Sequence, residues 1–218
     1  MNIIKKNAGF TIVELMISTA VFSVVLLLCA TAIINVGRTF YKGVTVNKTQ
    51  DTARKISEDL TQSIQFGTGN SAGFRVAKDR IIPYGGNDVK VYSLCLGEVR
   101  YSYSLDRSLG SNTAYQLPHV LWKDHGGNSA CSPLDITSAS LTGGEELLGD
   151  NMRVAVLDVP ELVTGSKVWS VSLTIAYGDQ ADLFVGGGTG DFKQCINKSS
   201  GGQFCAVSNI NTNAIMRL

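Results

Sequence analysis

An uncharged run of 23 residues, Leu15 to Gly37, constrains this chain more than any other feature of its sequence. At ~1.5 Å per residue, a helix of that length crosses the ~30 Å hydrocarbon core of a bilayer. We therefore expect a membrane-spanning helix. Glu14 stands immediately before this run, although a carboxylate near the bilayer interior costs roughly 2.5 to 3.5 kcal/mol and needs a partner or a function there.

The topology of the chain follows from basic residues on one side of the run and cysteines on the other. Lys5 and Lys6 precede the run and favour an N-terminus in the cytoplasm. Four of the five cysteines follow it, where an oxidising compartment would let them pair. We expect a single-pass protein of the cytoplasmic membrane with its N-terminus inside and its C-terminal part outside.

Those four cysteines, Cys95, Cys131, Cys195 and Cys205, predict two disulfides. Three pairings are possible, and we favour the nearest-neighbour one, Cys95 with Cys131 and Cys195 with Cys205. A zinc site is the alternative. It would lack a C-x-x-C motif, and the whole chain holds only two histidines.

Residues 38 to 66 have the pattern of an amphipathic helix. Apolar side chains recur at three- and four-residue steps, with charged side chains between them. Since no proline occurs before Pro83, one helix can run from about Phe10 to Phe66. The glycine-rich stretch Gly67 to Gly73 should end it.

The rest of the chain is patterned as β-structure. Strands are expected around "VKVYSLCL" and "EVRYSYSL", joined as a hairpin through Gly97 alone, and at "RVAVLDV" and "KVWSVSLTIAYGD". Residues 123 to 150 and 178 to 218 look loop-rich. The predicted fold class is α+β, with the apolar stripe of the long helix covering one face of an antiparallel sheet.

The N-terminal sequence "KKNAGFTIVELM" resembles the signal of type IV pilins and pseudopilins. Its basic leader, Gly9, Phe10, Thr11, Glu14 and the apolar run all match that pattern. The resemblance implies cleavage between Gly9 and Phe10 by prepilin peptidase and methylation of the new α-amino group of Phe10. It divides the chain into a leader (1–9), a transmembrane and assembly helix (10–37), an amphipathic helix (38–66) and an extracytoplasmic β-rich domain (67–218).

In this family the glutamate of one subunit is thought to meet the N-terminal amine of its neighbour, which assigns assembly roles to Phe10 and Glu14. The expected partners are other pilin subunits, the peptidase and an inner-membrane assembly platform. Two competing interpretations of the N-terminus are a secretory signal cut after Ala32 and a plain signal anchor. These would fit an anchored extracellular enzyme or adhesin.

Within the family, several features favour a minor subunit over a major pilin. The globular part is large, and the segment Cys29 to Ile33 lacks the proline that many major pilins carry there. The stretch "VWSVSLTIAYGD" is loosely similar to PilW-type minor pilins and J-type pseudopilins. A type II secretion pseudopilin and a major pilin remain alternatives.

Composition and motifs disfavour other functions. The formal net charge of +1 leaves no basic stripe for nucleic acid. We expect no enzymatic activity and no cofactor, because no catalytic motif is present. Asp179, Asp182 and Asp191 could supply oxygen ligands to calcium, although their spacing is not that of an EF-hand loop.

Overall fold

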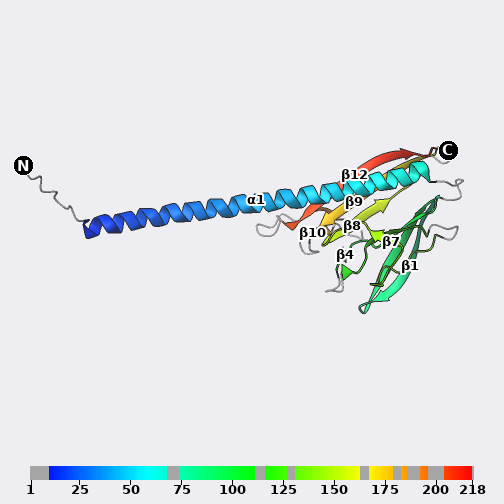
Figure 1. Ribbon diagram of the computed structural model, residues 1–218, viewed down its shortest axis with the longest axis horizontal. Coiled ribbons are helices and arrows are strands. Elements are labelled where there is room, and N and C mark those ends of the chain that lie inside the picture. The colour runs from blue at the N-terminus through cyan, green and yellow to red at the C-terminus, as the bar shows by residue number, and fades with distance from the viewer. Residues whose placement is uncertain are drawn as a thin grey trace, which may run out of the picture. The chain divides into compact units, whose positions relative to one another are not determined.

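The computed structural model describes residues 10–67, 74–110, 116–126, 131–162, 167–178, 183–185, 192–195 and 204–217. The chain divides into two compact units, Met1–Tyr41 and Lys42–Leu218. The first contains the apolar part of the long helix and the second contains the remainder of that helix with all the strands (Figure 1).

One long helix, α1, covers Ile12–Phe66. It is followed by Gly67, where a Cβ atom would lie 2.6 Å from the carbonyl oxygen of Ser63. A side chain at this position would therefore collide with the last helical turn. The backbone N–H of Arg217 donates to the carbonyl of Gln65 at 3.2 Å and satisfies one of the acceptors that a helix end leaves open.

Two five-stranded sheets stand where one sheet was expected. The first has the order β1-β2-β3-β6-β7, and all its neighbouring strands are antiparallel. Its strands are β1 (Phe74–Tyr84), β2 (Asn87–Leu96), β3 (Val99–Tyr103), β6 (Leu121–Asp124) and β7 (Gly144–Glu146). The predicted hairpin is β2 and β3, but its turn holds both Gly97 and Glu98.

The second sheet has the order β12-β9-β8-β4-β5, in which only the β4–β5 pair is parallel. It is built from β4 (Ser108–Leu109), β5 (Gln116–Leu117), β8 (Met152–Asp158), β9 (Val168–Tyr177) and β12 (Ala206–Ile215). A separate pair is formed by β10 (Leu183–Val185) and β11 (Phe192–Cys195). The ten-residue strand β12 corrects the expectation that the C-terminal part is loop-rich.

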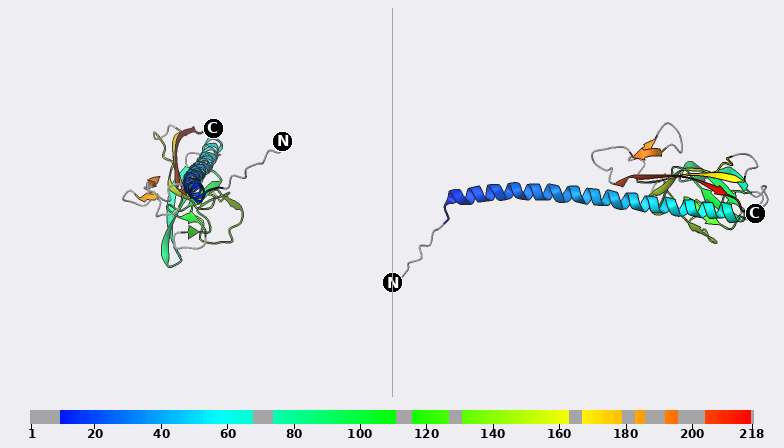
Figure 2. Two further views of the ribbon diagram at one scale, coloured as in Figure 1. Left: turned by 90° about the vertical axis from the view of Figure 1, so that its left-hand side faces the viewer. Right: turned by 90° about the horizontal axis from the view of Figure 1, so that it is seen from above.

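A single large core joins the second half of α1 to both sheets. Figures 1 and 2 show residues 42–66 running along β9 and β12. The buried positions of the helix are Thr49, Ala53, Ile56, Ser57, Leu60 and Ile64. The apolar ones among them belong to the same core cluster as Val171, Leu173 and Ile175 of β9. The α+β class is therefore confirmed, with the helix stripe as a cover.

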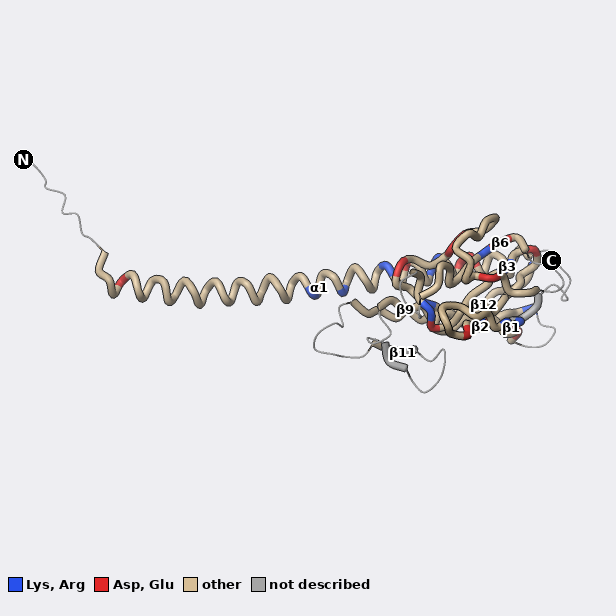
Figure 3. Tube along the Cα trace, turned by 90° about the horizontal axis from the view of Figure 1, so that it is seen from below, with Lys and Arg blue, Asp and Glu red and all other residues tan. Residues whose placement is uncertain are grey.

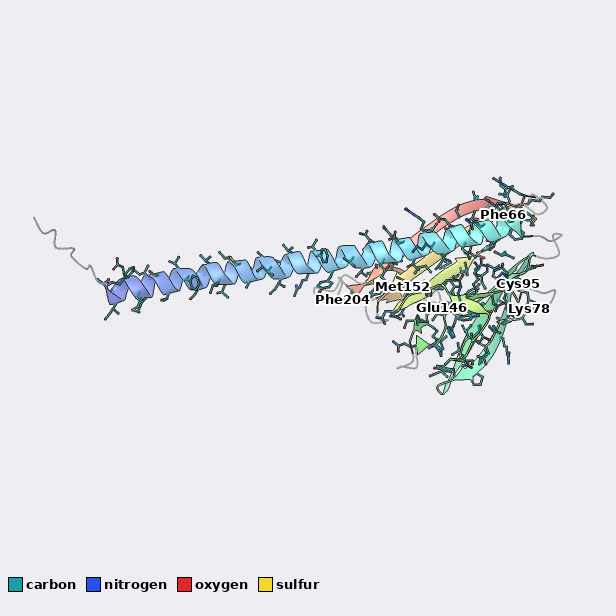
Figure 4. All side chains as sticks on the ribbon, viewed as in Figure 1. Phe66, Lys78, Cys95, Glu146, Met152 and Phe204 are labelled. Atoms are coloured by element: carbon teal, nitrogen blue, oxygen red, sulfur yellow. A yellow bond between two sulfur atoms is a disulfide. The ribbon has the colours of Figure 1, made fainter. Side chains whose placement is uncertain are left out.

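Both disulfides of the favoured pairing are present. Cys95, in β2 of the first sheet (Figure 4), is joined to Cys131 with Cα atoms 5.8 Å apart. Cys195, at the end of β11, is joined to Cys205 with Cα atoms 5.9 Å apart. The first link closes a span of 36 residues and the second a span of 10. Cys29 is a free, exposed cysteine.

Candidate functional site

Between Leu15 and Val36, α1 exposes apolar side chains around its whole circumference. None of its most hydrophobic 18-residue stretch is buried, and α1 is long and apolar enough to span a membrane. No charged residue occurs between Glu14 and Arg38, and Figure 3 shows this stretch of the helix in tan throughout. Helices that are apolar on every side are stable only when lipid or other protein surrounds them.

The start of α1 is closed by a reciprocal pair of hydrogen bonds. The backbone N–H of Glu14 donates to Thr11 Oγ1 at 3.3 Å, and the backbone N–H of Thr11 donates to Glu14 Oε2 at 3.2 Å. The Thr11 hydroxyl also donates to Glu14 Oε2, at 3.1 Å. This arrangement is a capping box, in which an N-cap threonine and a glutamate three residues later satisfy each other's N–H groups.

The capping box was missed in the sequence, although T-x-x-E before an apolar run is its signature. It gives Glu14 a structural role within its own chain. Among the residues that the structure describes, Glu14 has no ion-pair partner. Phe10 precedes the helix with 78% of its surface exposed, and Gly9 lies outside the described residues.

Residues 4–30 match the prokaryotic N-terminal methylation motif. The matched segment holds Gly9, Phe10 and Glu14 together with most of the apolar run. It supports a type IV pilin-like subunit that is processed as a prepilin. No curated protein and no solved structure matches the chain.

In the second unit, a charged clasp ties α1 to the first sheet. Asp59 of the helix accepts a hydrogen bond from the Tyr101 hydroxyl at 2.7 Å and one from Lys123 Nζ at 2.6 Å. Ser63, one turn further on, is hydrogen bonded to the same hydroxyl at 2.8 Å. Tyr101 lies on β3 and Lys123 on β6, so the clasp spans two neighbouring strands.

Burial raises the pKa of Tyr101, and the hydrogen bond to the Asp59 carboxylate raises it further. The phenol therefore stays protonated and keeps donating to Asp59 throughout the physiological range. Tyr101 is fully buried, whereas Asp59 reaches the surface. Their hydrogen bond therefore joins the helix to the inside of the sheet and fixes the position of the amphipathic half of α1 on the strands.

A second polar cluster surrounds Glu146 at the end of β7. Its carboxylate accepts hydrogen bonds from the backbone N–H groups of Val120, Leu121 and Leu148 at 2.8 to 3.1 Å. Burial raises the pKa of Glu146 in spite of these bonds, which lower it. His119 Nδ1 lies 3.7 Å from the same carboxylate, and burial lowers the pKa of this histidine.

The calcium candidates Asp179, Asp182 and Asp191 lie outside the described residues. Within the described ranges, no group of three His, Cys, Asp or Glu side chains could hold a metal ion. The buried Arg153 donates to the carbonyl of Gly178, the last described residue before Asp179, at 2.6 Å.

Proposed function

We propose that this chain is a subunit of a type IV pilus or a related filament, held in the cytoplasmic membrane before assembly with its second unit outside. One observation supports this above the others. The matched N-terminal motif leads directly into a helix whose apolar surface is fully uncovered in the single chain. Such a surface suits lipid before assembly and neighbouring copies of the same helix afterwards.

In this proposal, prepilin peptidase cuts between Gly9 and Phe10 and the new amine of Phe10 is methylated. The carboxylate of Glu14, held by Thr11 in the single chain, then exchanges its intrachain bonds for the amine of an adjacent subunit. A charged pair in a low-dielectric filament core is strongly destabilised if either partner is removed. The pair therefore selects processed subunits, since an uncut chain has no amine at this place.

We further propose that the chain acts as a minor subunit that initiates or modulates assembly. Its support is the large second unit, which begins at Lys42 and contains all the strands that the structure describes. The number of copies relative to other subunits in sheared filaments tests this role. A copy number comparable to that of the filament's main subunit would instead assign the chain as a major pilin.

The mature N-terminus provides the primary test of the filament proposal. Mass spectrometry of the chain purified from its native host should give an N-terminal peptide that begins at methylated Phe10. In a strain without prepilin peptidase, the same peptide should retain the leader. A chain cut after Ala32, or a chain that always begins at Met1, contradicts the proposal.

The role of Glu14 can be separated into charge and capping with two substitutions. Glu14→Gln keeps a side-chain oxygen that can complete the capping box but removes the charge, whereas Glu14→Ala removes both. We expect both variants to enter sheared filaments more than about tenfold less often than the parent, as expected for loss of one buried charge partner. Normal incorporation of the Gln variant would show that Glu14 serves as a cap alone.

A further inference from the structure

A groove opens at the C-terminal end of α1, between the helix and the first sheet. It consists of two adjoining cavities of about 370 and 320 Å³ that share Val99, Lys123 and His125 as walls. Asp59, Phe66 and Glu98 also line the larger cavity, and Glu145 lines the smaller one. We call this surface the acidic groove.

Negative charge exceeds positive charge in the acidic groove. Lys123 Nζ forms an ion pair with the Asp59 carboxylate at 2.6 Å and lies 3.8 Å from the Glu145 carboxylate. Glu145 is otherwise open to solvent, with 65% of its side chain exposed, and Glu98 has no ion pair within the described part of the chain. The last turn of α1 carries no basic residue, so its carbonyl ends add partial negative charge.

The groove also has an aromatic wall. Phe66, the last residue of α1, keeps 65% of its surface exposed and lines the larger cavity (Figure 4). An exposed aromatic ring in a groove with an excess of carboxylates suits an occupant that is both cationic and partly apolar, because the ring face attracts cations and the ring covers apolar surface.

The same chain carries a segment with this complementary chemistry. Between Leu15 and Gln50 there are no acidic residues, while Arg38, Lys42 and Lys48 are basic. Phe40 and Tyr41 are exposed between the first two, with ring centroids 6.2 Å apart. We call Arg38–Lys42 the basic segment. In Figure 3 this part of α1 carries basic residues and no acidic one.

We propose that the acidic groove of one copy binds the basic segment of a second copy. Lys42 and Phe66 are 24 residues apart on one helix, about 36 Å at ~1.5 Å per residue. The two surfaces are therefore different patches, and their contact is heterologous, with one copy displaced along the helix direction. A repeated contact of this kind builds an open filament.

This contact rests on the proposed filament function and specifies which surfaces meet. It requires only two adjacent copies, so it is compatible with a minor subunit as well as with a major one. Two copies at the same depth in a membrane cannot make it, because the groove and the basic segment would lie at different heights. The contact should form only when subunits leave the membrane in steps.

Site-specific photo-cross-linking of the full chain in assembled filaments tests the proposal. A benzophenone amino acid replaces Phe66, and the filaments are sheared, irradiated and digested with trypsin. We expect cross-linked dimers in which the probe is joined to the peptide of residues 39–42. Trypsin releases this peptide by cleaving after Arg38 and after Lys42. The matched control places the probe at Ile81 of β1, which is 62% exposed against 65% for Phe66, and should not label that peptide.

Charge reversal provides a second measurement on the same surfaces. Glu98→Lys with Glu145→Lys, or Arg38→Glu with Lys42→Glu, should each reduce the Phe66 cross-link about tenfold, and combining all four should restore it. If reversing the charges of the basic segment reduces incorporation while reversing the charges of the groove does not, the segment binds anionic lipid headgroups instead. The proposal is then wrong. Cross-links to a different subunit also overturn it.

The outcomes distinguish this contact from the proposed function itself. Processed chains that enter filaments normally but give no cross-link to residues 39–42 would reject the contact and leave the filament function standing. Parent chains that never enter filaments would reject the filament function.

Discussion

The two halves of α1 share one continuous backbone and differ in what covers them. Residues 12–41 present apolar side chains on all sides, and none of their described side chains is buried. Residues 42–66 bury one stripe against the sheets and leave charged side chains on the other faces. The second half has its partner within the chain, so the partner of the first half must come from outside.

The comparison also separates two kinds of stabilisation. In residues 42–66, apolar burial supplies most of the contact, and the clasp of Asp59, Tyr101 and Lys123 sets the position of the helix on the first sheet. In residues 12–41, the described contacts are local to the helix, such as the capping box, the helical hydrogen bonds and the Phe40–Tyr41 ring contact. Substitutions of the same type should therefore have opposite consequences in the two halves.

The largest expected difference comes from a leucine in each half. Leu60 has no exposed surface, whereas Leu27 is 67% exposed. Leu60→Ala should lower the free energy of unfolding by about 2 to 5 kcal/mol, since it removes buried methyl groups and leaves a cavity. Leu27→Ala should change it by less than about 0.5 kcal/mol. Urea unfolding of the full chain in detergent, followed by the fluorescence of Trp122 and Trp169, measures both.

A second measurement on Leu27→Ala is its incorporation into filaments, where we expect a clear effect in spite of its small effect on stability. Leu27 belongs to the surface that we assign to subunit packing, so Leu27→Ala should reduce incorporation even though the second unit stays folded. Equal losses of stability in the two variants would show that the first half of α1 also packs within its own chain, which contradicts the comparison.

The sequence predicted these two halves because each has a strong periodic or compositional signal. An uncharged run and a three- and four-residue apolar repeat are visible without a structure. The sequence also favoured the observed disulfide pairing, since each cysteine pairs with its neighbour along the chain. These features depend on local pattern.

Strand β12 was missed because its sequence shows only a weak alternation of apolar and polar residues. The residues it turns toward the core include Ala206, Ser208 and Ala214, which are small, and its outer face carries Asn209 and Asn211. Asparagine is depleted in strands. Here it is stabilised across the sheet, where Thr174 donates to Asn209 at 2.6 Å and Ser172 donates to Asn211 at 2.8 Å. Such pairs appear only once the register is known.

Long-range polar contacts were equally invisible in the sequence. Asp59 and Lys123 are separated by 64 positions, and their contact depends on how β3 and β6 pair beneath the helix. The acidic groove arises from the same pairing. The capping box, in contrast, is local and could have been recognised from Thr11 and Glu14.

The clasp provides the next test of the comparison, with a smaller effect than the leucines. Asp59→Asn removes the charge that holds Lys123 and weakens the acceptor of Tyr101, and should lower the free energy of unfolding by about 1 to 3 kcal/mol. Asp51→Asn is the matched control, because Asp51 is exposed on the same half of α1 and has no ion pair among the described residues. It should change stability by less than about 0.5 kcal/mol.

If Asp59→Asn is neutral, apolar burial alone positions the helix, and the distinction between burial and clasp is wrong. Salt separates the two contributions further. A clasp that includes an ion pair at the protein surface should weaken between low and high ionic strength, whereas the Leu60 effect should not.

The smallest expected effect concerns pH, and it belongs to the second unit alone. Burial lowers the pKa of His119 in the fold, so the unfolded chain binds a proton first as the pH falls below about 6.5. The free energy of unfolding should therefore decrease as the pH is lowered through this window. Burial raises the pKa of Glu146. Above about pH 4.5, this carboxyl group therefore makes the free energy of unfolding increase as the pH is lowered, opposite to the effect of His119.

His119→Phe should abolish the decrease just below pH 6.5, because phenylalanine preserves a ring against Trp122, whose centroid lies 4.5 Å from that of His119, but cannot bind a proton. Urea unfolding of the parent chain and of the variant at pH 5 and pH 7 measures the difference. A decrease that survives in His119→Phe cannot come from Glu146, because the raised pKa of Glu146 gives a slope of the opposite sign. Such a result would show that His119 is not the source of the decrease.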